Sequence, residues 1–143
     1  MINSDEPIIN QKPQISNNKL PTYKKISDNC FSLKISSTQL RKSTINANQL
    51  VRDIFKNSNL IDFSEIKPGE KKILHCRFIF KKEHINSRAS FLIPKRRGLT
   101  SPEARFWPYK LNKYVEQNMI LYFIVNNESS PYLEVHDKIP GNY

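Results

Sequence analysis

Short segments in which apolar and polar residues alternate constrain the fold of this chain more than any other feature. In residues 30–36, for example, Phe31, Leu33 and Ile35 alternate with polar side chains. A period of two is typical of a β-strand that buries one face. The expected strands are residues 30–36, 72–80, 88–93, 104–107, 119–125 and 132–136. Many short strands with few helices favour a mainly β domain, either a barrel or a sandwich.

The segment after the first expected strand has helical spacing instead. Its apolar residues recur three and four positions apart, at Ala47, Leu50, Val51, Ile54 and Phe55. This spacing predicts a helix of about three turns with one apolar face, and Asn46 is its expected N-cap. Residues 111–115 predict a second, shorter helical turn. Residues 37–42 are polar and predict a loop between the first strand and the helix.

The chain divides into a polar lead-in at residues 1–28, one domain at residues 29–137, and the start of a linker to a further domain at residues 138–143. No apolar run is long enough to span a bilayer, and the first residues lack the pattern of a secretory signal. Cys30 and Cys76 stand far apart without metal-binding spacing, so both are expected to be small buried hydrophobes. We expect a soluble, cytoplasmic chain without a cofactor or a membrane partner.

Positive charge is concentrated in one part of the chain. The 23 lysines and arginines exceed the 13 acidic residues by ten, which favours a polyanionic partner. The segment from Arg88 to Lys113 supplies six of these ten charges, with Glu103 as its one acid. Its basic residues are Arg88, Lys95, Arg96, Arg97, Arg105, Lys110 and Lys113. A basic loop between two strands fits the major groove of B-DNA, which admits a two-stranded ribbon.

The residue types in this loop suit base reading as well as phosphate binding. Arginine binds guanine with two hydrogen bonds, and a carboxylate accepts one from the cytosine amino group. Glu103 and Arg105 lie on one face if the segment is extended, so they are the expected base readers; the simpler interpretation is a local salt bridge. A second expected contact is the first loop, through Thr38, Gln39, Arg41 and Lys42.

Two other functions fit part of the sequence. Asp62, Glu70 and Lys72 resemble the acid and lysine pattern of metal-dependent endonucleases, although Glu70 follows Pro68 and Gly69 in an expected turn, and such chemistry needs rigid carboxylates. RNA binding is the other alternative, because Trp107, Tyr109 and Tyr114 are aromatic residues of the kind that stack on unpaired bases. We favour packing roles for these rings.

The order of elements resembles a known DNA-binding fold. The first strand, the short capped helix and the element Glu103-Ala104-Arg105-Phe106-Trp107 are similar to the DNA-binding pseudobarrel of plant B-three transcription factors, in the version found in the restriction enzymes EcoRII (N-terminal domain) and BfiI (C-terminal domain). The resemblance covers residues 30–137. It implies a seven-stranded open β-barrel with two short helices. It also implies two groove-binding loops, an N-arm at Ser37–Lys42 and a C-arm at Lys95–Arg105.

The function expected from the residues and the resemblance together is sequence-specific binding of double-stranded DNA, without catalysis in this chain. Such a domain would be the target-recognition module of a bacterial restriction system, for example one like McrBC or LlaJI. A nuclease or a nucleotide-driven motor would then lie in another domain of the same protein or complex. No nucleotide-binding P-loop sequence is present in the chain.

Overall fold

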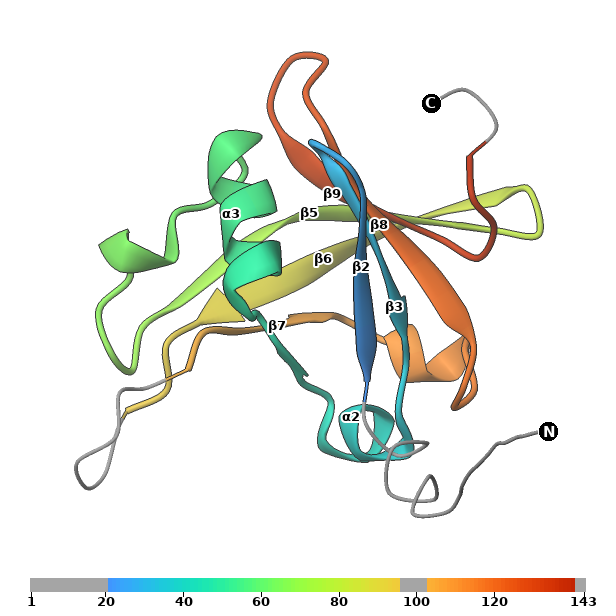
Figure 1. Ribbon diagram of the computed structural model, residues 1–143, viewed down its shortest axis with the longest axis horizontal. Coiled ribbons are helices and arrows are strands. Elements are labelled where there is room, and N and C mark those ends of the chain that lie inside the picture. Colours follow the sequence, from blue (N-terminus) through green and yellow to red (C-terminus); the bar gives the residue numbers. More distant parts are fainter. Residues whose placement is uncertain (1–20, 96–102, 141–143) are drawn as a thin grey trace, which may run out of the picture.

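The described part of the chain forms one curled, open β-sheet of eight strands with two short α-helices (Figure 1). The computed structural model describes residues 21–95 and 103–140. The elements are β2 (Thr22–Ser27), β3 (Cys30–Lys34), α2 (Ser37–Lys42), β4 (Ile45–Asn46), α3 (Gln49–Asn57), η1 (Phe63–Glu65), β5 (Lys71–Phe80), β6 (Glu83–Leu92), β7 (Arg105–Pro108), η2 (Leu111–Lys113), β8 (Ile120–Asn126) and β9 (Tyr132–His136). The mainly β prediction is confirmed.

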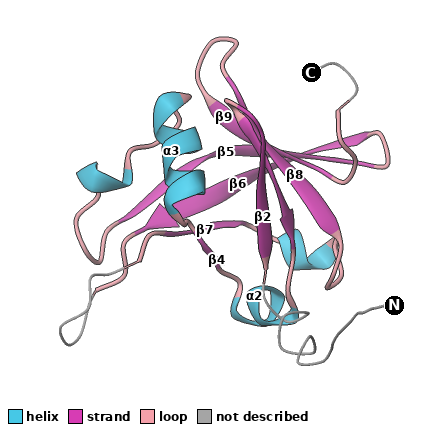
Figure 2. Cartoon of the chain, viewed as in Figure 1, coloured by secondary structure: helices cyan, strands magenta, loops and turns pink. Residues whose placement is uncertain are grey.

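The strands follow the order β2-β3-β8-β9-β5-β6-β7-β4 across the sheet. All neighbours are antiparallel except β5 and β9, which are parallel. The sheet curls into a half-barrel, and α3 lies over its open side, as Figure 2 shows. The edge strands are β2 and β4. They are close in sequence, but they lie at opposite edges of the sheet.

The resemblance implied seven strands, and the sheet has eight. Two of the eight are absent from the six strands that the sequence pattern predicts: the two-residue β4, and β2, which forms at Thr22–Ser27 in the expected lead-in. This strand pairs with β3 through a tight turn at Asp28 and Asn29. Its sequence lacks a clear period of two because Lys24 and Lys25 are both exposed on an edge strand. The turn residues were the available signal, since Asp and Asn favour tight turns.

The segment predicted as a loop, residues 37–42, is a helix instead. Ser36 is the N-cap of α2, and its hydroxyl accepts a hydrogen bond from the Gln39 backbone N–H (3.1 Å). The Gln39 side chain in turn accepts one from the Ser36 backbone N–H (2.9 Å). This reciprocal capping box satisfies two backbone donors that a short helix otherwise leaves unpaired. Ser43 ends the helix in the left-handed conformation, with φ of 53°.

The predicted helix at residues 47–55 is confirmed as α3, but it begins two residues later than expected. Asn48, not Asn46, is the N-cap and accepts from the Val51 N–H at 3.0 Å. The reason is tertiary: the Ala47 N–H donates to the Ala104 carbonyl (2.8 Å), which continues the β4–β7 ladder by one residue. The first helical turn therefore starts only after this strand contact ends.

Six phenylalanines form the centre of the core between the sheet and α3. Phe55, on α3, contacts rings from three strands: Phe31 on β3 (5.8 Å between centroids), Phe91 on β6 (5.8 Å) and Phe106 on β7 (5.3 Å). Phe63 and Phe123 complete the cluster. Both cysteines and Trp107 are buried as expected. This helix therefore holds strands from both halves of the sheet together.

Candidate nucleic-acid interface

A pocket of about 320 Å³ lies where α2 meets the two edges of the sheet. Its lining residues are Pro21, Tyr23, Ser36, Thr38, Gln39, Lys42, Thr44, Asn46 and Arg105. Three of the four residues predicted in the first contact segment, Thr38, Gln39 and Lys42, thus share a pocket with Arg105 from the second. The structure brings together residues that are more than sixty positions apart in sequence. Arg41 is exposed and is not among the lining residues.

Arg105 reaches the pocket because it is the first residue of β7. It pairs with Asn46 of β4 on one side and with Leu92 of β6 on the other. The next residue, Phe106, points to the opposite face and is fully buried in the core. The Nε atom of Arg105 is buried and has no hydrogen-bond partner among the described residues. A buried donor of this kind is unusual in folded proteins, and here it belongs to a side chain that borders a pocket.

Tyr23 joins the two edges of the half-barrel beside this pocket. Its hydroxyl donates a hydrogen bond to the Asn46 carbonyl (2.8 Å), which links β2 to β4. The Gln39 amide nitrogen lies 3.5 Å from the same hydroxyl. Burial raises the pKa of Tyr23 to about 12, and the negative charge of Glu103 adds to this effect. The phenol therefore stays protonated, and Glu103 lies within electrostatic range of the pocket wall.

Gln39 has a structural role that its sequence context had not indicated. Only 7% of the residue is exposed, and its amide oxygen and nitrogen contact Ser36 and Tyr23. This side chain, which was predicted to contact DNA, is thus engaged within the protein. Thr38 and Lys42 are exposed on the same helix, and neither side chain forms a hydrogen bond or ion pair within residues 21–95 and 103–140.

Six predicted contact residues remain, and the structure describes four of them. Lys95 and Glu103 are exposed at the two ends of the expected C-arm. Arg96 and Arg97, within that arm, lie outside the described residues. Arg88 is exposed on β6, and Lys110 is exposed beside η2 in the left-handed conformation. Arg88, Lys95, Glu103 and Lys110 do not line the pocket.

Tyr23, Thr44 and Asn46 line the pocket, although none of them was predicted to contact a ligand. Tyr23 lies in residues 1–28, which were expected to be a polar lead-in. Thr44 and Asn46 flank Ile45, whose buried side chain marks a short strand. Polar residues on both sides of a single buried one are a weak signal, because a two-residue strand is shorter than any periodic pattern can identify.

The carboxylates of the endonuclease alternative take part in local turns. Asp62 accepts hydrogen bonds from the backbone N–H and the hydroxyl of Ser64 (3.0 and 2.7 Å), and these contacts lower its pKa. Glu70 accepts from the Lys67 N–H at 3.0 Å. Within residues 21–95 and 103–140, no group of three or more His, Cys, Asp and Glu side chains is arranged to hold a metal ion.

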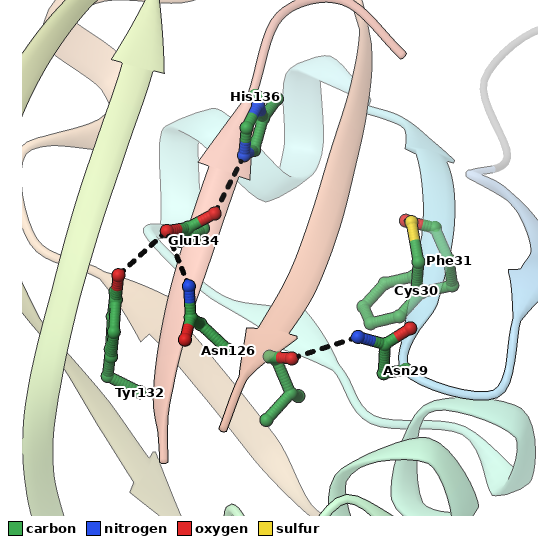
Figure 3. A network of polar contacts seen from close by, with 8 residues as sticks. Asn29, Cys30, Phe31, Asn126, Tyr132, Glu134 and His136 are labelled. Carbon is green, nitrogen blue, oxygen red and sulfur yellow. Dashed lines mark hydrogen bonds and ion pairs between the residues drawn. The ribbon is translucent and has the colours of Figure 1, made fainter. Parts of the chain in front are cut away.

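A separate polar network lies on the outer face of β8 and β9 (Figure 3). One oxygen of Glu134 accepts from the Tyr132 hydroxyl (2.8 Å) and the Asn126 amide (3.2 Å), and the other lies 3.0 Å from His136 Nε2. The hydrogen bond to His136, with those to Tyr132 and Asn126, lowers the pKa of Glu134 to about 2. The carboxylate is therefore ionised at neutral pH although only 9% of the residue is exposed.

This network predicts a dependence of stability on acidity. The pKa of Glu134 is lower in the folded protein than its ordinary value of 4.5, so its stabilising effect is complete above pH 4.5 and is lost as the pH falls towards 2. Glu134→Gln is expected to lower the free energy of unfolding at pH 7 by about 1–3 kcal/mol, because one of the two acceptor oxygens becomes an amide nitrogen, which cannot accept the hydrogen bonds made at that position. Urea unfolding at pH 7 and pH 3 measures this, and the variant should lose less stability than the wild type between them. An equal loss in both proteins would contradict the assigned role of Glu134.

Comparison with known proteins leaves the site to be interpreted from its own chemistry. No protein-family model, curated protein or solved structure matches this chain. In the described ranges, none of the helices has the length and apolar content needed to cross a membrane. The pocket between α2 and β7 brings together two cationic side chains and several hydroxyl groups.

Proposed function

We propose that this chain is a double-stranded DNA-binding domain whose contact surface is centred on the pocket between α2 and β7. The observation that carries the proposal is the convergence of Thr38 and Lys42, on α2, with Arg105, on β7, around one pocket. These are three hydrogen-bond donors, two of them cationic, that come from two separate segments. A two-sided arrangement of this kind suits a polyanion lying across it.

The distribution of charge supports the same partner. The chain carries a net charge of +10. Its positively charged side chains repel one another in the folded state unless an anion is bound. Lys42 is exposed on α2, and Lys95 is exposed at the start of the expected C-arm. Neither lysine forms an ion pair with a described residue. Lysines without a carboxylate partner are available to neutralise phosphates, which supplies most of the affinity of proteins for duplex DNA.

Sequence specificity is the finer part of the proposal. Arg105 and Glu103 are the proposed base readers, because Arg105 borders the pocket and the charge of Glu103 acts on Tyr23 in its wall. An arginine selects guanine and a carboxylate selects cytosine in the major groove. With the resemblance to the restriction-enzyme pseudobarrel, this leads us to propose a target-recognition module of a restriction system, attached to a nuclease or motor domain.

The test is a binding titration of the purified chain against a fluorescent pool of randomised duplexes, with single-stranded RNA as competitor. We expect saturable binding to duplex DNA, enrichment of a defined sequence on repeated selection, and a steep fall in affinity with salt. Binding without enrichment would reduce the function to non-specific DNA binding. Preferential displacement by the RNA would favour the RNA-binding alternative, and cutting of the duplex in magnesium would favour the endonuclease.

A further inference from the structure

Two arginines are held against aromatic rings on the outer face of the β5–β6 hairpin. His75 and Arg88 are cross-strand partners, and Arg77 lies two residues from His75 on the same face. The Cζ atom of Arg77 is 5.5 Å from the centroid of the Tyr132 ring, and that of Arg88 is 6.0 Å from the centroid of Tyr109. Contact with a ring favours one position of the guanidinium, so less side-chain entropy remains to be lost when a ligand binds.

Neither arginine forms an ion pair in the part of the chain that the structure describes. This is notable for Arg77, whose cross-strand partner on β9 is a carboxylate, Glu134. Both oxygens of that carboxylate are instead engaged by Tyr132, Asn126 and His136 (Figure 3). Glu134 therefore accepts hydrogen bonds within its own network. It forms no ion pair with Arg77.

The groups on this face that remain free to bind a ligand suit a phosphate better than a stacked base. One side of each tyrosine ring is already covered by a guanidinium. Arg77 donates through Nε to Asn86 (3.4 Å), which leaves its terminal nitrogens, and Arg88 is exposed. A positioned, unpaired guanidinium presents a planar set of donors that matches the oxygens of a phosphate group.

The two arginines lie on the face that Arg105 also occupies. Arg105 pairs with Leu92 on β6, and Arg88 lies four residues from Leu92 on the same face of that strand, about 13 Å away at 3.3 Å per residue. Arg77 lies about 20 Å from Leu92 along the hairpin by the same measure. We propose that this face binds the sugar–phosphate backbone of the duplex whose other part lies at the pocket. This inference rests on the proposed function.

The experiment compares salt dependence of duplex binding among variants of the whole chain. The double variant Arg77→Gln with Arg88→Gln is expected to bind about tenfold to a hundredfold more weakly and to reduce the slope of log affinity against log salt by about 1.8, which corresponds to two phosphate contacts. The matched control is Lys24→Gln. Lys24 is exposed on β2, an edge strand that lies four positions from β5 in the strand order.

Tyr109 provides a second measurement that does not change the charge. Tyr109→Leu removes the ring beside Arg88 and is expected to weaken binding about threefold, whereas Tyr109→Phe keeps the ring and should retain full affinity. A double arginine variant that behaves like Lys24→Gln overturns this inference. If Lys42→Gln and Arg105→Ala still weaken binding in that case, the proposed function stands. A wild-type chain that does not bind duplex DNA overturns both.

Discussion

Phe55→Ala is expected to destabilise this domain by about 3–5 kcal/mol, the range for truncating a buried phenylalanine. The ring is fully buried and contacts phenylalanines from β3, β6 and β7. Its removal leaves a cavity between α3 and both halves of the sheet, and the strands cannot close over it without leaving their register. Because single domains are stable by only about 5–15 kcal/mol, this one change removes a large share of the total.

Urea-induced unfolding followed by circular dichroism measures the effect of Phe55→Ala. The matched control is Ile120→Ala, which also shortens an apolar side chain in the sheet but at a residue that is 49% exposed. The control should change stability by no more than about 0.5 kcal/mol. A similar loss in both variants would mean that α3 does not join the two halves of the sheet through Phe55.

Arg105→Ala is expected to weaken binding to the selected duplex by about 1–3 kcal/mol and to relax the preference at one base pair. The reason is that Arg105 borders the pocket with a buried donor that has no partner among the described residues. Lys42→Gln, on α2, is expected to weaken binding to all duplexes alike and to reduce the salt slope by about 0.9. The two variants thus separate base reading from phosphate binding at one site.

The matched control for the pocket is again Lys24→Gln. Lys24 is exposed on β2, where it lies beside Ile120 and Tyr122 of β8 rather than in the pocket, and the same single charge is lost. It should leave the affinity and the preferred sequence nearly unchanged. If Arg105→Ala reduces affinity for random and selected duplexes equally, Arg105 binds the backbone and the base-reading assignment is wrong.

Most strands were predictable from the sequence, because a half-buried strand has a period of two that is visible without its neighbours. Cys30–Lys34, Lys71–Phe80 and Tyr132–His136 are examples. The elements that were missed have other causes. β2 is an exposed edge strand with adjacent lysines, and α2 is too short for periodicity and depends on the reciprocal bonds of Ser36 and Gln39. The spacing of Ser36 and Gln39 was the signal that predicts such a cap.

The candidate site was predictable in its residue types but not in its construction. The sequence indicated that Lys42 and Arg105 belong to basic or polar segments, and left open whether those segments meet. Their meeting depends on β2 and β4, which reach each other through the hydrogen bond from Tyr23 to Asn46. It also depends on Gln39, which the sequence suggested as a ligand contact and which instead helps to hold α2 in place.

By itself, the sequence determined that the chain forms a mainly β structure with one amphipathic helix and an excess of positive charge around residues 88–113. These are local properties, since alternation and charge are carried by neighbouring residues. Only the tertiary structure decided that Lys42 and Arg105 line one pocket, and that Arg77 is the cross-strand partner of a carboxylate already bound by other groups. Alternation states which face of a strand is buried, but the partner of each strand is set by the curl of the whole sheet and the packing around Phe55.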